Sequence, residues 1–564
     1  MSTKLNDRAI RTERLVPAAL LGLCTLIAQS AQAQIAPDAG RTLQQLQPPI
    51  AAPRESKPLS IQAPLPTGLV LPGGAVVVVQ TVSFAGNSVI NQDTLQTALG
   101  DVAGKSFDLA GLRALADRIG DFYRASGFPF ARAVLPPQDL KLGALRIEII
   151  EGRYGLVQAQ VIGTEDAALA TQATLFLGSL KPGAVIESAA LERASFLLDD
   201  LPGIKTAPVI RPGAQTGTGD LIMQISRDKR FTGDVGLDNA GSRYTGQTRA
   251  RANLNINSPF MLGDQIRINT LVSDEQLWLG SLSYSLPMGA SGLRGNVGYS
   301  HTSYELAKEF ANLQADGTAV VASAGLSYPL VRSQKTNLTL SGTYQAKDFQ
   351  DNKGSTSTRE SKSSQSVPIA LQFDNRDSAG GGGITYGSLG WTPGKLKLDA
   401  ALTAADTNNT RGSFNKFNLD LVRLQSLPAG FSLMGHINLQ SASKNLDSSE
   451  KMSLGGAGGV RAYPTSEAIG DEGVLAQLEL RYSAGSYAPY VFVDGGSIKT
   501  NAKPAPGATN NKRSLSGGGV GVRYQRNAWS GDATLAWRNT GGAPQADTSR
   551  DPKPRVWVNL GYRF

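Results

Sequence analysis

From about Lys229 to its end, the chain consists of strand-like segments in which apolar and polar side chains alternate. Helical periodicity is absent there, and Gly, Asn, Asp and Ser interrupt the alternation. The last segment is the clearest, because Val556, Val558, Leu560, Tyr562 and Phe564 alternate with Arg555, Trp557, Asn559, Gly561 and Arg563. One face of such a strand suits lipid and the other suits a wet lumen.

This alternation predicts a transmembrane antiparallel β-barrel over residues 229–564. At roughly 20 residues for each spanning strand with its turn or loop, this length gives about 16 strands. A soluble β-sandwich also alternates, but it does not usually extend over so many residues as one unit. A closed barrel leaves no open sheet edge, which lipid would not tolerate.

Composition supports a chain of many strands and turns. Hydrophobic residues make up 41% and charged residues 18% of the 564 positions, and 63 are glycine. This glycine-rich, charge-poor composition is unlike that of a helical enzyme, and the length requires several folding units.

The first 33 residues have the three parts of a secretory signal peptide. Basic residues precede an apolar run, Leu15 to Ile27, and Ala31-Gln32-Ala33 forms a small-x-small cleavage site. The run is shorter than the ~20 residues of a spanning helix. Cys24, the only cysteine, lies in this run, so the predicted mature chain has no disulfide or thiolate chemistry.

Two α+β modules are predicted between the signal peptide and the barrel. Residues 34–47 could form a short helix or a disordered tail, and the proline-rich residues 48–74 indicate an extended linker. Each module has the order strand, helix, helix, strand, strand, and this repetition is itself a signal of modular structure. The first module covers residues 75–154 and the second covers 155–228. The expected helices are 91–99, 109–123, 167–177 and 186–198.

No catalytic, metal or cofactor site is predicted, so we expect a protein that is not an enzyme. The glycine clusters lack the lysine of a phosphate-binding loop, so ATP is not implied. His301 and His436, the only histidines, lack adjacent ligand or nucleophile patterns. The net charge of +9 is spread among scattered basic and acidic residues, which argues against nucleic-acid binding.

Short motifs in both modules resemble those of a known family. They are Phe84-Ala85-Gly86-Asn87, Tyr123 to Phe128, Leu135-Pro136-Pro137-Gln138 and Leu201-Pro202-Gly203. With the order of the parts, they resemble the two-partner secretion transporters (TpsB), the hemolysin secretion/activation proteins of the BamA-type superfamily. The modules are similar to the POTRA domains of that superfamily.

A second resemblance lies within the barrel. Residues 454–463 are similar to the family's inward-folding loop, whose tip motif Val-Arg-Gly-Tyr corresponds here to Val460, Arg461, Ala462 and Tyr463. Ala462 replaces a glycine, so it would be strained if that position required positive φ.

The family's second motif, Phe-x-Asp-x-Gly on an inner strand, corresponds to Phe492, Asp494 and Gly496. The resemblance implies that Arg461 meets Asp494 at the barrel wall, through charge-assisted hydrogen bonds. Taken without the surrounding architecture, a flexible glycine loop and an ordinary lumen-facing aspartate would be the simpler interpretations. The terminal Phe564 is similar to the aromatic residue that directs barrel assembly.

The resemblance implies an outer-membrane transporter with its modules in the periplasm. An unfolded partner exoprotein would bind the modules by strand addition and leave through the barrel without ATP. The first module could offer a groove along Leu112, Ile119 and Tyr123, and the short helix within residues 34–47 would plug the resting pore. The loop that carries Arg461 would be a gating loop, which rearranges or stabilises the open barrel. Further expected partners are outer-membrane lipids and the barrel-assembly machinery, and the expected oligomeric state is a monomer.

Two alternatives remain at this point. An assembly factor or insertase of the same superfamily would be expected to carry a longer array of modules. A passive porin or receptor would have no evident use for two peptide-docking modules. The identity of the cargo does not follow from the residues.

Overall fold

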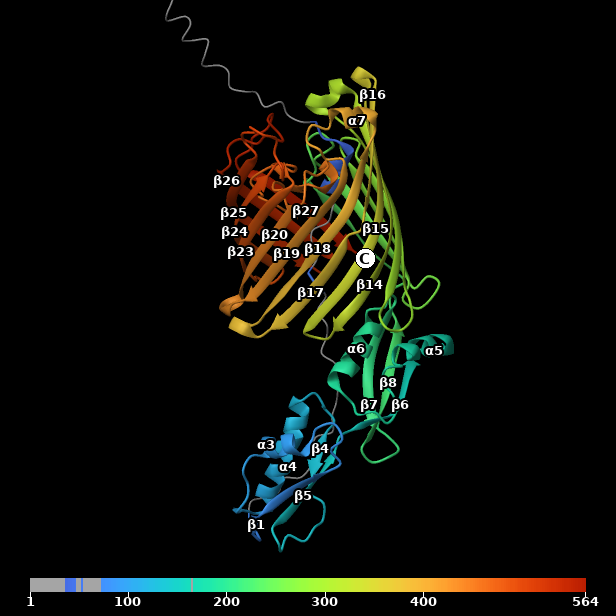
Figure 1. Cartoon of the computed structure of the whole chain (residues 1–564), viewed down its shortest axis with the longest axis vertical. Helices are drawn as coiled ribbons and strands as arrows, with labels where there is room; N and C mark the ends of the chain where they lie inside the picture. The colour runs from blue at the N-terminus through green and yellow to red at the C-terminus, as the bar shows by residue number, and fades with distance from the viewer. Residues whose placement is uncertain (1–35, 47–51, 54–72, 164–165) are drawn as a thin grey trace, which may run out of the picture. The chain divides into compact units, whose positions relative to one another are not determined.

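The computed structural model describes residues 36–46, 52–53, 73–163 and 166–564. The predicted signal peptide and most of the predicted linker lie outside these ranges. The described residues form a short helix, two α+β modules and a β-barrel (Figure 1).

The first module packs two helices on a small sheet. Its elements are β1 (Val77–Val79), β2 (Thr81–Ala85), α3 (Gln92–Leu99), β3 (Lys105–Phe107), α4 (Leu109–Ala125), β4 (Arg132–Val134) and β5 (Ala144–Ile150). The main sheet has the order β2-β5-β4, with β2 and β5 parallel, and β1 pairs with β3. Asn91 and Asp108 cap the two helices by accepting hydrogen bonds from backbone N–H groups of the first turn.

The apolar face of α4 is used by the module's own core. Leu112, Ile119 and Tyr123 are only 3%, 0% and 0% exposed, and they pack with side chains of β5 and α3. The predicted peptide groove along these three residues is therefore wrong for this structure. A module of this size needs its amphipathic helix to complete its core, which leaves that face unavailable to a ligand.

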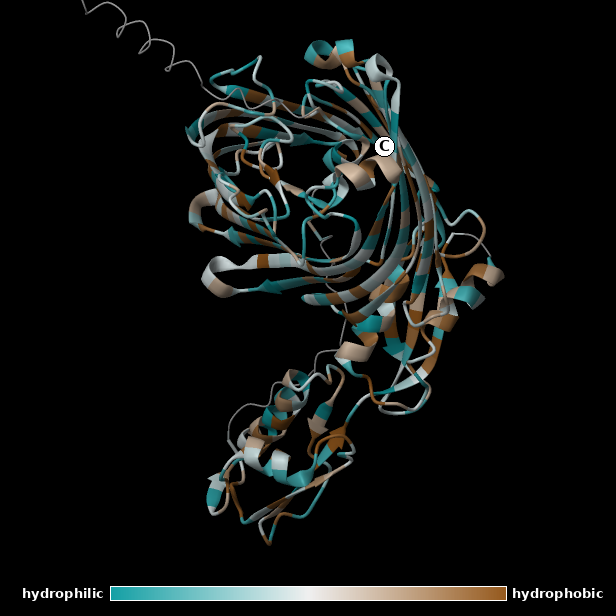
Figure 2. Cartoon of the chain, turned by 45° about the horizontal axis from the view of Figure 1, so that its top comes forward, coloured by the Kyte–Doolittle hydropathy of each residue, from teal (hydrophilic) through white to brown (hydrophobic). Residues whose placement is uncertain are grey.

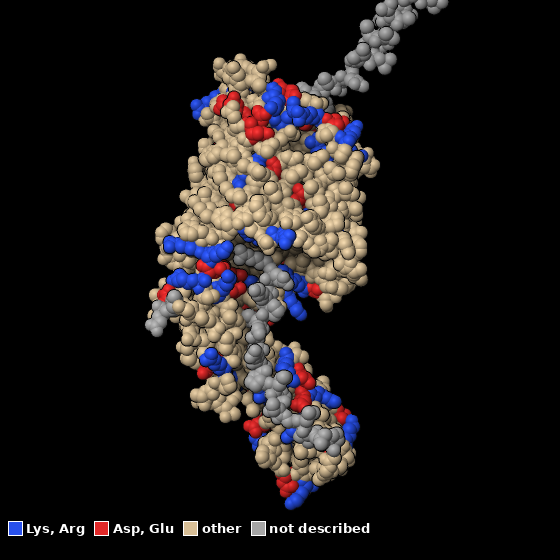
Figure 3. Space-filling view, turned by 180° about the vertical axis from the view of Figure 1, so that it is seen from behind, with Lys and Arg blue, Asp and Glu red and all other residues tan. Residues whose placement is uncertain are grey.

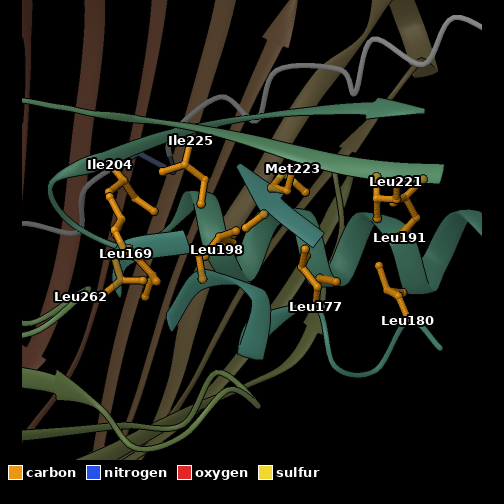
Figure 4. Packing of buried hydrophobic residues seen from close by; sticks show 14 of the residues in the cluster. Leu169, Leu177, Leu180, Leu191, Leu198, Ile204, Leu221, Met223, Ile225 and Leu262 are labelled. Carbon is orange, nitrogen blue, oxygen red and sulfur yellow. The ribbon is translucent and has the colours of Figure 1, made fainter. Parts of the chain in front are cut away.

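The second module repeats this plan. It contains β6 (Arg153–Val161), α5 (Ala167–Phe176), α6 (Ser188–Asp199), β7 (Ile204–Pro212) and β8 (Thr218–Arg227), with the sheet order β6-β8-β7. Leucine and isoleucine side chains of both helices and of the sheet form its core (Figure 4), which Leu262 from the turn between β10 and β11 joins. Because β6 begins at Arg153, the predicted boundary after residue 154 falls inside a strand.

The barrel begins with β9 and closes when the last strand, β27, pairs with it. All neighbouring strands are antiparallel. Their bounds are β9 (Phe231–Asp238), β10 (Arg249–Asn257), β11 (Gln265–Ser273), β12 (Trp278–Pro287), β13 (Arg294–Glu305), β14 (Ala315–Arg332), β15 (Thr336–Lys353), β16 (Thr358–Ser366), β17 (Ile369–Asp377), β18 (Gly383–Leu398), β19 (Gly412–Ser426), β20 (Phe431–Ala442), β23 (Glu472–Tyr482), β24 (Tyr487–Lys499), β25 (Lys512–Arg526), β26 (Trp529–Thr540) and β27 (Arg555–Arg563).

Two of these segments, β16 and β17, are halves of one spanning strand. Both pair with β15 on one side and with β18 on the other. The break lies at Val367-Pro368, where proline has no N–H to donate to the ladder. With this pair counted once, residues 229–564 form a closed barrel of 16 strands, which confirms the predicted fold class.

The alternation separates a lipid face from a lumen face. In β27, Val556, Val558 and Leu560 are 44–49% exposed, whereas Arg555 and Trp557 are both 6% exposed. Apolar and polar residues alternate along the barrel strands (Figure 2), and the outer wall shows a broad band with few charges (Figure 3). None of the described helices is long and apolar enough to cross a membrane.

The shorter elements of the barrel region lie in its connections. They are η1 (Lys308–Leu313), η2 (Gly354–Thr356), η3 (Ala379–Gly381), α7 (Ala400–Ala405), η4 (Pro428–Gly430), η5 (Ser448–Glu450), β21 (Met452–Ser453) and β22 (Ile469–Gly470). The connection from β20 to β23, residues 443–471, is here called the lumen loop. The helix α2 (Ala39–Gln45) packs against η5 of this loop and against β13, β14 and β15.

Candidate functional site

The site is built on the lumen face of β23 and β24. Val491 and Val493 are more than half exposed on the outer wall, whereas Phe492 and Asp494 alternate with them and are buried toward the lumen. Glu479 of the neighbouring β23 pairs with Phe492 in the strand register and points the same way. The three side chains therefore form one patch of the inner wall.

The lumen loop places Arg461 over this patch through a glycine-dependent turn. Val460 N–H donates to the carbonyl of Leu454 at 2.7 Å, and Tyr463 N–H donates to the carbonyl of Val460 at 3.0 Å. A Cβ on Gly459 would collide with the Leu454 carbonyl oxygen, so the close approach of the two backbones requires glycine.

Arg461 makes a bidentate pair with Asp494, as the resemblance implies. Its Nε and Nη2 donate to the two carboxylate oxygens at 2.8 and 2.7 Å, and its backbone N–H donates to Oδ2 at 3.1 Å. Its Nη1 donates to Glu479 Oε1 at 2.6 Å, and its guanidinium carbon lies 3.5 Å from the centroid of the Phe492 ring. One buried cation thus joins two carboxylates and an aromatic face.

Glu479 was not among the predicted site residues. It also binds Arg481 at 2.7 Å and Arg523 at 3.0 Å, so three guanidinium groups and two carboxylates form a single network. A weak signal was present, because Glu479 lies between the outward-facing Leu478 and Leu480 in an alternating strand. Removing one member of such a network leaves a buried charge uncompensated.

Ala462 is not strained, contrary to the conditional expectation from its replacement of glycine. It is absent from the residues with positive φ, and its methyl group is buried against β25. A Cβ built on Gly517 would come within 2.5 Å of the Ala462 Cβ, so Gly517 supplies the space. Gly496 has a similar role, since a Cβ there would come within 2.8 Å of Leu454.

Further hydrogen bonds connect the lumen loop to both strands at the barrel closure. Trp557 of β27 donates its indole N–H to the Arg461 carbonyl at 2.7 Å. Thr465 donates its hydroxyl to the Ala240 carbonyl just after β9 at 2.8 Å, and Tyr463 donates its hydroxyl to the Thr540 carbonyl at 2.8 Å. Phe564 pairs with Gly233 of β9 through backbone hydrogen bonds of 3.0 and 3.3 Å.

The helix α2 makes polar contacts with the barrel strands and with the lumen loop. Asp38 caps it and accepts hydrogen bonds from Lys362 at 3.1 Å and from Ser448 at 2.6 Å. Ala39 N–H donates to Asp351 at 2.9 Å, and Gln45 donates to Ser466 of the lumen loop at 2.6 Å. Through these bonds the helix is attached to β15, to β16 and to the lumen loop.

Two family models match the chain. The model of the haemolysin secretion/activation protein ShlB/FhaC/HecB matches residues 217–524, which is more than half of the chain. The POTRA domain of ShlB type matches residues 77–152. The heme/hemopexin transporter protein HuxB of Haemophilus influenzae strain 86-028NP is 26% identical over 493 residues, covering 85% of each chain. The outer membrane transporter CdiB of Dickeya dadantii is 23% identical over 496 residues, with the same coverage.

Solved structures agree on the fold. CdiB from Escherichia coli aligns with a TM-score of 0.70 at 19% identity, over 93% of this chain and 95% of that chain. BamA from Haemophilus ducreyi lacking POTRA domains 1–3 aligns with a lower TM-score of 0.51 at 14% identity, over 87% of this chain and 100% of that chain. The chain belongs to the haemolysin secretion/activation family, and it is an outer-membrane two-partner secretion transporter with its POTRA region in the periplasm.

Proposed function

We propose that α2 is the removable plug of this transporter and that the lumen loop is a fixed part of its wall. The observation that carries this proposal is the difference in attachment. Arg461 is tied to Asp494 and Glu479 by several buried, charge-assisted bonds of 2.6 to 2.8 Å, whereas α2 is a single seven-residue helix whose Asp38 pairs with Lys362 at the longer distance of 3.1 Å. Loss of α2 would clear the β13 to β15 wall without disturbing the Arg461 network.

Cargo capture is proposed to use sheet edges of the modules. The buried α4 face excludes the groove first expected, but β2 and β4 are the outer strands of the first sheet, and β6 and β7 are those of the second. An unfolded exoprotein can add to such an edge as a further strand through backbone hydrogen bonds. Passage through the lumen would then need no ATP, because folding outside the cell favours export.

Phe564 is proposed as the residue that the barrel-assembly machinery recognises, with the monomer as the functional unit. Phe564 is 43% exposed, while its backbone completes the pairing with β9. One chain closes the barrel by itself, so no second copy is needed to cover a sheet edge.

The Arg461 pair can be tested by secretion. Arg461→Ala and Asp494→Ala should each reduce release of a co-expressed exoprotein at least about tenfold, because the first leaves Asp494 without its cation and the second leaves Arg461 with only one of its two carboxylates. The measurement is exoprotein in the medium relative to transporter in the outer membrane.

Arg481→Ala is a matched control, because it removes an arginine from Glu479 but leaves the loop tip attached. It should reduce release less than Arg461→Ala. Full secretion by correctly assembled Arg461→Ala and Asp494→Ala barrels would contradict the proposed role of the pair.

A further inference from the structure

His436 of β20 lies on the lumen face beside the Arg461 site. Its Nε2 lies 3.1 Å from Asp420 Oδ1 of β19, and its Nδ1 lies 2.8 Å from Gln477 Oε1 of β23. The imidazole is mostly buried, and it joins three adjacent strands. The role proposed for the Arg461 pair does not include this residue.

The partners of Gln477 determine which way its amide points. Its Nε2 donates to the carbonyl of Gly459 at 2.8 Å and to Asp494 Oδ1 at 3.3 Å, and both of these atoms can only accept. The amide oxygen must therefore face His436. Gln477 thus connects the imidazole to the lumen loop and to the carboxylate that binds Arg461.

Both ring nitrogens of His436 consequently face acceptors. Asp420 is an acceptor at Nε2, and it is itself held by Asn438, which donates to Oδ2 at 2.9 Å. The Gln477 oxygen is an acceptor at Nδ1. An imidazole satisfies two acceptors only when both nitrogens carry protons, which is the charged form.

We propose that His436 is a positioning residue that acts as an imidazolium, orienting Gln477 so that its amide clamps the lumen loop at Gly459 and Asp494. This inference rests on the proposed role of the Arg461 pair. Removal of one proton would leave a lone pair facing an acceptor. If Gln477 turned over in response, its oxygen would face the Gly459 carbonyl and the clamp would be lost.

The surrounding charges favour the protonated ring. Asp420 of β19 contacts the imidazole directly, and Asp494 of β24 is linked to it through Gln477. Glu479 of β23 lies two positions beyond Gln477 and is bound by Arg461, Arg481 and Arg523. The clamp should therefore be intact at low pH and should weaken as the pH rises and the ring loses its charge.

A spin label on the lumen loop tests the clamp directly. Gly458 is exposed, and a Cβ there would meet nothing within 4 Å, so Gly458→Cys can carry the label on the full chain with Cys24→Ser. Between about pH 6 and pH 9, the mobile fraction of the label should rise roughly threefold or more, as one charge-assisted hydrogen bond is lost.

Three variants complete the test. His436→Gln should give a mobile label at both pH values, and His436→Lys, which keeps a cation, should remove the pH dependence and restore immobility. His301→Gln is the matched control and should behave as the parent, because His301 lies on another strand and contacts the Trp278 ring edge.

The outcomes separate this inference from the proposed function. A label that is immobile at both pH values in the parent and in His436→Gln overturns the role of His436. If Asp494→Ala then mobilises the label, the loop attachment stands without His436. If Asp494→Ala leaves the label immobile as well, the proposed attachment of the loop by this pair is wrong.

Discussion

At the loop tip, the residue next to Arg461 packs closely against the barrel wall. The Ala462 methyl group occupies space that Gly517 leaves open on β25. We predict that Gly517→Ala destabilises the folded barrel by about 1–3 kcal/mol, the usual range for overpacking a tight contact. The free energy of unfolding in lipid vesicles measures this effect.

The double variant Gly517→Ala with Ala462→Gly should recover much of this loss, because it moves the methyl group from one partner to the other. The backbone of Trp537 lies 2.8 Å from the position of the new Cβ, which limits the recovery. Equal losses in the single and double variants would show that Ala462 is not the limiting contact.

Only part of this site could be predicted from single residues. Arg461 and Asp494 stand in motifs that resemble those of a family, so their pairing could be expected before the fold was known. Glu479, His436 and Gln477 stand in ordinary alternating strands, and their roles depend on which strands become neighbours. Register across the barrel is a long-range property that local sequence does not contain.

Among the elements, α2 depends on one glycine for its contact with the lumen loop. A Cβ on Gly40 would collide with Ser448 Oγ and come within 2.8 Å of the Ser449 nitrogen. Gly40→Leu should therefore change the equilibrium between bound and released α2 by roughly 5–150-fold in favour of the released helix. This change is equivalent to about 1–3 kcal/mol. Single-channel recordings should show a larger open fraction than in the parent.

A matched control for this change is Gly342→Leu, since Gly342 has nothing within 4 Å of a built Cβ. It alters the barrel by the same chemistry and should leave the recordings unchanged. Identical recordings from Gly40→Leu and the parent would argue against α2 as the plug.

The first module contains a buried carboxylate that makes its stability depend on pH. Glu151 accepts hydrogen bonds from the Ser88 and Val89 backbone at 2.6 and 2.9 Å and pairs with Arg153 at 3.0 Å. Burial raises its pKa, but hydrogen bonds from Ser88 and Val89 and the Arg153 charge outweigh this effect, so the pKa is lowered.

The pKa of Glu151 is lower in the folded module than in the unfolded chain. The ionised Glu151 therefore stabilises the module fully above the ordinary glutamate pKa of ~4.3, and this stabilisation is lost as the pH falls through the lower, folded-state pKa. Glu151→Gln should cost the module about 1.5–3 kcal/mol at neutral pH and flatten its acid dependence. Hydrogen exchange of residues 73–152 in the full chain measures both effects. An unchanged acid dependence in the variant would assign it to another carboxylate.

Element prediction succeeded where the periodicity was long. The barrel strands and α4 follow clear patterns, whereas β3 has three residues and was missed. The strand segment that opens the first module is divided at Gln80, because β1 pairs with β3 and β2 pairs with β5. The choice of partner strand, rather than propensity, makes that division.

At the scale of the whole molecule, the barrel closes through a short strand pairing. Among the pairings between complete spanning strands, the one between β27 and β9 is the shortest. It joins Asn559–Arg563 to Asp234–Asp238, whereas β26 and β27 pair from Trp529 to Ala536. The lumen loop bonds to both sides of this closure, through Trp557 on β27 and Ala240 beyond β9. A sequence pattern can predict a closed barrel, but it cannot show that a loop from a distant hairpin supports the closure.

Trp557→Phe combined with Thr465→Val should therefore weaken the closure while leaving the Arg461 pair with Asp494 in place. Each substitution removes one hydrogen bond of the loop, worth about 0.5–1.5 kcal/mol, so the two together should lower the temperature at which the barrel unfolds. A disulfide between cysteines at Leu560 and Leu237, which are register partners, should restore this temperature if separation at the closure is the cause.

Trp537→Phe, on the outer wall of β26, is the control and should have a smaller effect. If the double variant unfolds like the parent, these two hydrogen bonds of the lumen loop contribute nothing to the closure.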